Sequence, residues 1–319
     1  MPPPRDNGAV IERIHRQPEL VAVWALLALV GLAVFVTYSR VPPTELYNVS
    51  HSGVVGGASR LVVFLGFPVS LAVFAIVPVA YDLAAIPRRR PLLALTAVAT
   101  IPLCATIAIP GVLKESDLDA KWANAPAAIG VALAILVTVA ALANRLAPAA
   151  PRWARADTAR LVVALVLLVC ATPWIAAELG FYLPGHFFLT GQIRPFAGEG
   201  GHALGPAVHH GDHHGLSGVE LALVAIALSR VVPRMQRSWR RPLAAAYLSL
   251  LLIYGLANAL QDFWLEQFVK RGWTTSRIPS LLHPSLSFAW GAMLIAAAVV
   301  FLLLFRPRGP APPDAIIAT

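Results

Sequence analysis

Histidines are concentrated in one short stretch of this sequence. Five of the nine lie within 13 residues, at His202, His209, His210, His213 and His214. Imidazole is a good ligand for zinc, copper, iron and nickel. A solvated, pH-sensitive loop or an adventitious metal-binding tract is the alternative interpretation. The residue types favour a transition-metal site, with zinc or iron expected before copper.

The spacing of these residues favours a site built on a helix. If a helix begins near His209, then His209 and His213 lie one turn apart on one face, and His210 and His214 pair in the same way. Histidine pairs of this spacing form many zinc sites. Glu220 follows two turns beyond His213 on the same stripe. We therefore expect His209, His213 and Glu220 to be the first metal ligands, with the other pair on the second face.

Carboxylates in two apolar stretches lie at a matching depth. Steps of four residues place Trp174, Glu178 and Tyr182 on one helix face, and Tyr254, Asn258, Asp262 and Glu266 on another. Ionisable residues inside membrane spans face a protein interior or a wet cavity. We expect Glu178 or Asp262 to be the catalytic general base, and His186, His202 and Glu266 to be further metal ligands. Ion pairs with Arg194, Lys270 or Arg271 are the structural alternative for these acids.

The segment His210-Gly211-Asp212-His213-His214 resembles the HxxHH box of membrane fatty-acid desaturases and hydroxylases. Those enzymes hold two irons with several such boxes, so the resemblance implies a metal-dependent membrane enzyme. The combination of helical histidines with acids near one membrane face is also similar to that of seven-helix zinc hydrolases of the ceramidase and adiponectin-receptor type.

The composition requires that these residues be positioned by membrane-spanning helices. The 319 residues are 58% hydrophobic and 13% charged, whereas soluble domains are about 45–50% apolar and about 25% charged. Long apolar runs predict spanning helices, because lipid cannot satisfy exposed backbone polar groups. We predict an all-α polytopic membrane bundle of eight helices, at residues 20–38, 61–86, 92–112, 125–143, 161–183, 216–232, 243–265 and 286–305.

The distribution of basic residues predicts the orientation. Of the 25 lysines and arginines, 17 fall on one side of the predicted membrane and 8 on the other. Because cytoplasmic loops carry the excess of basic residues, both termini are expected in the cytoplasm. Residues 1–19 and the Pro-rich residues 306–319 would be cytoplasmic tails, residues 20–305 the membrane domain, and the His- and Gly-rich loop 184–215 extracytoplasmic.

The same distribution bears on partners and location. The net charge of +9 lies in short loops between apolar runs, so it indicates membrane topology, and nucleic acid is not an expected partner. Membrane lipid is the expected surrounding. Arginine outnumbers lysine 22 to 3, which is typical of a GC-rich bacterial genome and favours a bacterial cytoplasmic membrane.

Three functions fit these patterns. The first is a metal-dependent enzyme that acts on a lipid or another apolar substrate at an extracytoplasmic-facing site, where the metal activates water or polarises an oxygen. The second is a transporter or acceptor of transition metals, although the inner halves of the runs at 161–183 and 243–265 are almost wholly apolar. The third is a structural or assembly protein with an incidental histidine loop.

Overall fold

The computed structural model describes residues 17–84, 91–114, 116–144, 152–193, 205–236 and 239–305. Within these ranges the fold is helical, as predicted, apart from one antiparallel pair of two-residue strands, β1 (Gln192–Ile193) and β2 (Gly205–Pro206). The longer helices are α2 (Pro18–Arg40), α3 (Gly53–Phe64), α4 (Ser70–Leu83), α5 (Pro91–Ala105), α6 (Ala125–Ala143), α7 (Arg155–Cys170), α8 (Thr172–Glu178), α9 (His214–Ser229), α10 (Arg240–Trp264) and α11 (Phe288–Phe305).

Short helical segments extend several of these helices. They are η1 (Pro43–Glu45), η2 (Leu65–Val69), η3 (Thr106–Ala108), η4 (Trp122–Asn124), η5 (Val232–Arg234) and η6 (Leu265–Val269). The segment η2 is a π-turn that contains Pro68 and joins α3 to α4. Proline removes a backbone donor, and a π-turn is a usual way for a helix to absorb that loss.

The chain is a multi-pass membrane protein by the length and apolarity of its helices. Seven described helical segments are long and apolar enough to cross a membrane, and the bent pair α7–α8 gives an eighth if it forms one span. The prediction of one continuous helix over residues 161–183 is wrong, because the chain bends by 58° between α7 and α8. Pro173 lies in the first turn of α8; its ring cannot follow the preceding helix without a clash.

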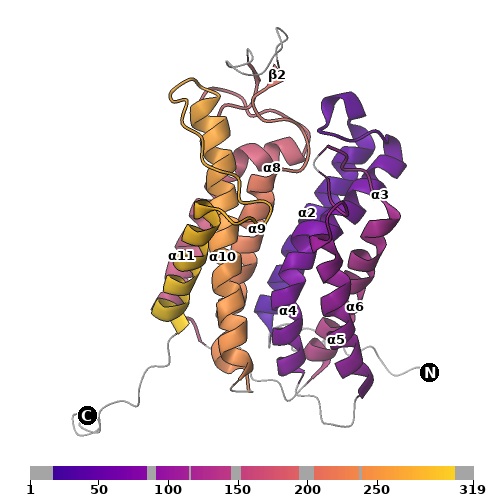
Figure 1. Ribbon diagram of the computed structural model, residues 1–319, viewed down its shortest axis with the longest axis vertical. Helices are drawn as coiled ribbons and strands as arrows, with labels where there is room; N and C mark the ends of the chain where they lie inside the picture. The colour runs from indigo at the N-terminus through magenta and orange to yellow at the C-terminus, as the bar shows by residue number, and fades with distance from the viewer. Residues whose placement is uncertain are drawn as a thin grey trace, which may run out of the picture.

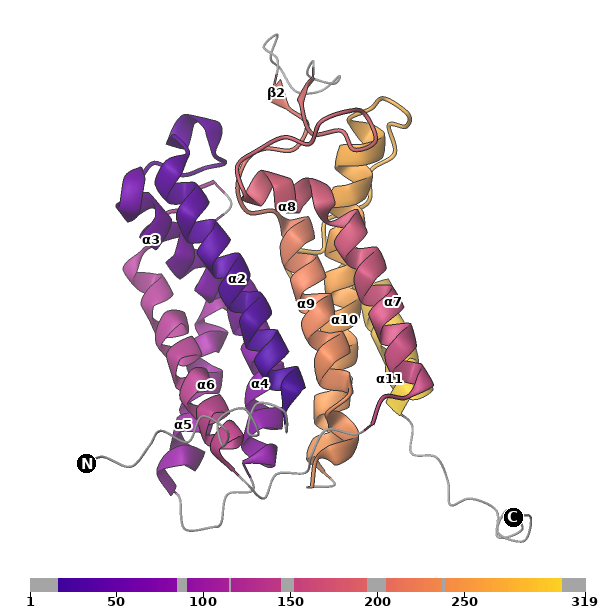
Figure 2. The ribbon, with the colours of Figure 1, turned by 180° about the vertical axis from the view of Figure 1, so that it is seen from behind.

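The helices form two groups that lie side by side (Figures 1 and 2). The N-terminal group consists of α2 to α6, and the C-terminal group of α7 to α11. They meet along a junction where α2 and α4 pack against α9 and α10. Within the C-terminal group, α9 and α10 approach closely, since a Cβ atom on Gly218 would lie 2.5 Å from the carbonyl oxygen of Gly255. Small residues permit such close backbone packing between membrane helices.

The two ends of the bundle differ in their residues. The histidine end carries His209 to His214, and the opposite end carries the arginine-rich starts of α7 and α10. Exposed tryptophans mark both ends: Trp122 and Trp273 at the histidine end, Trp153 and Trp239 at the opposite end. Tryptophan favours the membrane–water interface, so these side chains delimit the span between the two ends.

Candidate functional site

Helix α9 begins later than the histidine spacing suggested. It starts at His214, and His213 is extended, with φ −121° and ψ 143°. Gly211 adopts a left-handed φ of +98°, and a Cβ atom there would lie 2.7 Å from Cζ of Tyr38. This glycine turn interrupts any helix between His210 and His213. The prediction of one helical stripe through His209, His213 and Glu220 is therefore wrong.

The loop nevertheless brings two of the histidine rings together. The rings of His209 and His213 stack with centroids 4.0 Å apart, and Tyr47 stacks on the other face of His209 at 4.8 Å. Both ring nitrogens of His213 face protein acceptors: Nε2 is 2.8 Å from the His209 carbonyl oxygen and Nδ1 is 3.4 Å from Oε1 of Glu266. These contacts hold the His213 ring in one orientation.

The histidine pair lies against two acids, Asp262 near the end of α10 and Glu266 in the following segment η6. Oε2 of Glu266 accepts a hydrogen bond from Trp174 Nε1 at 2.6 Å, and Oδ2 of Asp262 accepts one from the backbone N–H of Gly215 at 2.6 Å. We call His209, His213, Trp174, Asp262 and Glu266 the histidine network. The helical spacing predicted that the acids of α10 and the histidine loop would share one level, and the structure brings them together there.

The pKa values of the two histidines of this network are shifted in opposite directions. Burial would lower the pKa of His213, but the carboxylate of Glu266 and its hydrogen bond outweigh burial and raise that pKa above its usual value. Burial and the neighbouring His213 lower the pKa of His209 well below its usual value. The neutral form of His209 and the charged form of His213 are thus favoured together.

Most metal-ligating atoms of this network already have protein partners. Among the residues that the structure describes, no group of three or more His, Cys, Asp or Glu side chains has the geometry to hold a metal ion. Stacked imidazoles direct their nitrogens along parallel planes, whereas a shared metal needs the nitrogens to converge. A metal in the histidine network would therefore require His209 and His213 to unstack.

A second polar cluster lies at the junction of the two helix groups. Glu178, at the end of α8, and Glu220, on α9, are 2% and 1% exposed, and within the described part of the chain none of their four carboxylate oxygens has a hydrogen-bond partner. Glu178 interacts electrostatically with Asp212, Arg60 and Glu220. These four residues and Tyr38 form what we call the acidic centre.

Arg60 and Tyr38 hold Asp212 in the acidic centre. Nη2 of Arg60 is 2.8 Å from Oδ2 of Asp212, and both side chains are buried. The hydroxyl oxygen of Tyr38 accepts the backbone N–H of Asp212 at 3.0 Å. The Arg60 guanidinium lies 5.6 Å from the centroid of the Tyr38 ring, within the range of a cation–π contact. Asp212 is thus the ion-pair partner of Arg60, the arginine of the acidic centre.

The charges of the acidic centre do not balance. Asp212 and Arg60 form an ion pair. Glu178 interacts with Arg60 only at longer range, and among the described residues neither Glu178 nor Glu220 has an ion-pair or hydrogen-bond partner of its own. A buried carboxylate that is neither paired nor hydrogen-bonded has a desolvation cost of several kcal/mol. Binding of a proton or another cation would therefore stabilise each of these two glutamates.

The position of Glu178 depends on the short helix α8, which crosses from one group to the other. The Glu178 carbonyl oxygen accepts a hydrogen bond from the Thr37 hydroxyl, and the Leu179 carbonyl accepts one from Arg40 Nη2 at 2.7 Å. Both donors belong to α2 of the N-terminal group. The Ala177 carbonyl accepts the N–H of Gly211 at 3.0 Å. The end of α8 is therefore tied to both the opposite group and the histidine loop.

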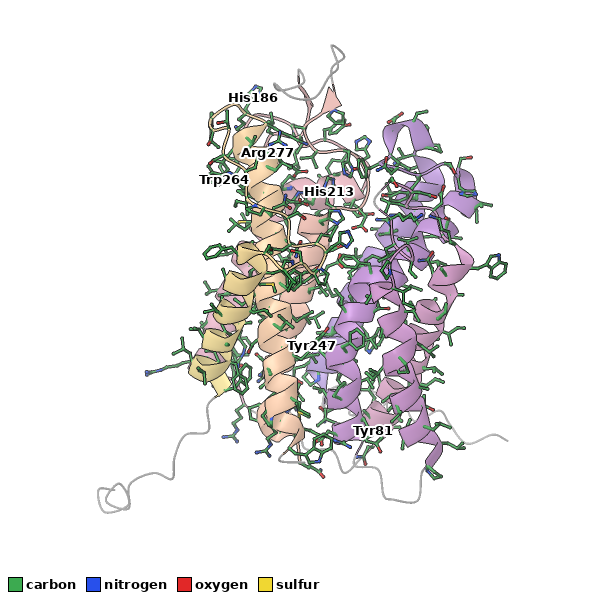
Figure 3. All side chains as sticks on the ribbon, in the orientation of Figure 1. Tyr81, His186, His213, Tyr247, Trp264 and Arg277 are labelled. Atoms are coloured by element: carbon green, nitrogen blue, oxygen red, sulfur yellow. The ribbon has the colours of Figure 1, made fainter. Side chains whose placement is uncertain are left out.

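The remaining predicted ligands belong to neither cluster as defined or lie outside the described residues, although His214 is close enough to interact electrostatically with Asp262 and His209. His210 stacks on Tyr182 with centroids 4.3 Å apart, and burial lowers its pKa. His214 lines a small void beside Tyr254. Figure 3 shows His213 within the bundle and His186 at its outer edge, where His186 is exposed. His202 lies outside the residues that the structure describes.

Three members of the acidic centre were missed by reasoning from the sequence. Arg60 lies one residue before the predicted helix at 61–86, but helix α3 begins at Gly53 and contains it. Gly56 is the residue that could have indicated the packing of α3 against α2, because small residues are typical of close helix contacts in membranes. A Cβ atom on Gly56 would lie 3.0 Å from the Tyr38 carbonyl oxygen. Asp212 was considered only as part of a histidine motif, and Tyr38 only as the end of a span.

Comparisons of the chain with known protein families, with curated proteins and with solved structures found no match. What the arrangement can do is therefore argued from side chains. The histidine network offers imidazoles and carboxylates that already bind each other. The acidic centre offers two buried carboxylates that do not, and buried ionisable groups in membrane spans are typical of ion and proton pathways.

Proposed function

We propose that the chain is a proton-coupled membrane transporter in which Glu178 and Glu220 bind the protons. The observation that carries this proposal is the pair of buried carboxylates at the junction of the two helix groups, which have no hydrogen-bond partner in the part of the chain that the structure describes. A proton removes the charge of a carboxylate and so removes most of its desolvation cost. Carboxylates inside spans are common proton carriers in membrane pumps and transporters.

Protons fit the acidic centre better than a bound metal ion. Calcium takes six to eight oxygen ligands and magnesium requires a near-ideal octahedron, whereas a proton needs one carboxylate oxygen. The third acid of the centre, Asp212, is already paired with Arg60 at 2.8 Å. Two remaining carboxylates match two protons without any further ligand.

The location of the acidic centre supports coupling of protonation to movement. When Glu178 and Glu220 are protonated, the junction contains no unpaired charge and the two groups can pack closely. Loss of the protons leaves two negative charges in dry surroundings, which favours opening of the junction to water. Rocking of one helix group against another around a central site is a general way to alternate access across a membrane.

We further propose eight spans, with α7 and α8 counted as one, and both termini in the cytoplasm of a bacterial cell. The 17 to 8 distribution of basic residues supports this orientation. The histidine end would then be extracytoplasmic, and protons would reach Glu178 and Glu220 from outside the cell.

Proton uptake into lipid vesicles tests this proposal. The purified chain is reconstituted with a pH-sensitive dye inside, and the outside is acidified. We expect uptake to be at least about 10-fold slower in the Glu178→Gln and Glu220→Gln variants, because a carboxamide cannot carry the proton. Glu45→Gln is the control, since Glu45 is an exposed carboxylate at the same end. Equal rates in all four proteins would contradict the proposal.

A metal-dependent enzyme that acts on a membrane lipid is the second candidate. The convergence of His213, Asp262 and Glu266 favours it. In that case His209, His213 and Glu266 would hold zinc or iron, and Asp262 would be the general base. Elemental analysis of protein purified without a histidine tag tests this candidate. A stoichiometric metal that is lost in His213→Gln would support the enzyme, and metal-free wild-type protein would contradict it.

A further inference from the structure

Buried ion pairs close the junction at the end opposite the acidic centre. Glu19, in the first turn of α2, lies between two arginines of the C-terminal group: Oε1 is 3.0 Å from Nη1 of Arg230, and Oε2 is 2.7 Å from Nη2 of Arg234. Only 6% of the Glu19 side chain and 8% of the Arg234 side chain are exposed. Each of these pairs connects one helix group to the other.

A second set of contacts crosses the junction beside the first. Oδ2 of Asp82, on α4, accepts the backbone N–H of Gln236 at 2.6 Å, and Oδ1 lies 3.8 Å from Nη1 of Arg240. The Arg240 guanidinium also covers the ring of Tyr81 at 4.8 Å. Asp82 and Tyr81 belong to the N-terminal group, whereas Gln236 and Arg240 belong to the C-terminal group. Figure 3 shows Tyr81 at this end of the bundle.

The same network reaches helix α7. Nε of Arg230 is 3.1 Å from Oδ1 of Asp157, which also pairs with Arg160 at 2.9 Å. Arg230 thus joins α2 to α7 through two carboxylates. Movement of α7, which carries α8 and Glu178, would change the contacts of Arg230.

An apolar layer separates these ion pairs from the acidic centre. On α2 and α9 it consists of the buried side chains of Leu27, Val34, Leu221, Val224 and Leu228. Within this layer the Tyr247 hydroxyl of α10 donates a hydrogen bond to the Leu71 carbonyl oxygen of α4 at 2.8 Å. Figure 3 shows Tyr247 above the level of Tyr81. The acidic centre is therefore closed toward the opposite end by dry packing and then by charge.

Buried ion pairs contribute little net stability, because desolvation offsets the attraction between the charges. Their best-attested role is to fix a register or to serve as a switch. Separated charges regain their hydration, so the contact can open at small net cost if both partners reach water. Removal of one partner, in contrast, leaves an uncompensated charge in the closed contact.

We infer that Glu19 and Asp82, with Arg230, Arg234 and Arg240, form the gate of this transporter at the end opposite the acidic centre. The inference rests on the proposed function. The gate is closed in this structure. It separates when the acidic centre becomes accessible from that end, and its pairs re-form when the centre faces the histidine end.

Thiol accessibility tests the gate. Val224 is fully buried on α9, between Glu220 and Arg230, so Val224→Cys, with Cys104→Ala and Cys170→Ala, reports whether water reaches the junction. A membrane-impermeant thiol reagent is applied from the opposite end of the chain in lipid vesicles. We expect Glu19→Gln and Asp82→Asn to raise the modification rate at least about 10-fold, because the first removes the carboxylate that pairs with Arg234 and the second the one beside the partly buried Arg240.

Matched variants separate a gate from a general loosening. Asp117→Asn removes a partner from an ion pair of 2.9 Å, with Lys121, within one loop at the histidine end, and it should leave the rate unchanged. The exchange Asp82→Arg with Arg240→Asp restores a pair of opposite charges, but not the acceptor for the N–H of Gln236, and should return the rate part of the way to that of the parent. It also provides a readout if Glu19→Gln fails to fold.

The outcomes for the gate and for the transporter are distinct. The gate would be overturned if the thiol modification rate is the same in the parent and in Glu19→Gln, Asp82→Asn and Asp117→Asn. Slow proton uptake in Glu178→Gln would then still support the transporter. If the modification rate rises in Glu19→Gln and Asp82→Asn but proton uptake is unchanged in Glu178→Gln, the gate would stand. The role of the acidic centre in proton binding would be overturned.

Discussion

Arg60 is the positive charge around which the acidic centre is organised. It neutralises Asp212 at 2.8 Å inside the bundle, so its loss would leave three carboxylates in one buried region. We predict that Arg60→Gln destabilises the protein by about 3–5 kcal/mol, the cost of an uncompensated buried charge. Thermal denaturation of the protein in detergent micelles would register this as a lower midpoint.

A double-variant comparison decides whether that effect belongs to the pair. If Arg60 acts by neutralising Asp212, then Arg60→Gln combined with Asp212→Asn should recover most of the lost stability, since two neutral partners can be tolerated where one charge cannot. Additive losses in the double variant would show that Arg60 acts through packing against Tyr38 instead.

Trp174 controls the placement of the element that carries Glu178. Its indole donates to Glu266 at 2.6 Å and its ring is fully buried. Trp174→Phe leaves a buried carboxylate oxygen without its donor, at a cost of about 1–3 kcal/mol. We predict that α8 then loses its fixed position and that proton uptake into vesicles slows.

Trp153 is the matched control for this variant. Its indole also donates a hydrogen bond, to Thr158 at 3.0 Å, but its ring is exposed at the opposite end. The Trp153 ring also lies 5.9 Å from the guanidinium of Arg230, and phenylalanine keeps an aromatic ring at that contact, so Trp153→Phe should leave proton uptake unchanged. A similar loss in both variants would mean that the effect is a general one on tryptophan anchoring in the membrane.

The helices themselves were largely predictable, and their interruptions were not. Runs of apolar residues located the seven long apolar helical segments and the bent pair α7–α8, because a lipid environment favours continuous apolarity. The break at Pro173 and the start of α9 at His214 depend on a proline clash and on a glycine turn against Tyr38. The glycine turn depends on a contact between residues distant in sequence. Helical spacing alone therefore could not predict that Glu220 lies near Asp212 and away from the histidines.

At the scale of the whole molecule, the sequence predicted at which end of the bundle the acids lie. It did not predict which residues they contact. Topology places the ends of α8 and α10 and the start of α9 at one end of the bundle, and the sequence indicated this. Which helix groups meet there is decided by tertiary packing of α2 against α9. The separation into a satisfied histidine network and an unsatisfied acidic centre therefore became visible only in three dimensions.

The orientation that we propose rests on the distribution of arginines and can be measured directly. Reporter domains fused after Arg155 and Arg241 should be active on the cytoplasmic side, and those fused after Lys121 and Arg277 on the outer side, because basic loops are retained in the cytoplasm. The reverse pattern would place the acidic centre on the cytoplasmic side and its source of protons with it.

Infrared spectroscopy of the purified chain in lipid nanodiscs tests the role of Glu178 and Glu220 most directly. A protonated carboxylic acid has a C=O stretching band that a carboxylate lacks. At neutral pH we predict such a band in the wild type, a partial loss in Glu178→Gln and in Glu220→Gln, and the largest loss when both are changed, with no loss in the exposed control Glu45→Gln. A wild-type band that is absent, or that persists unchanged in the double variant, would contradict proton binding at the acidic centre.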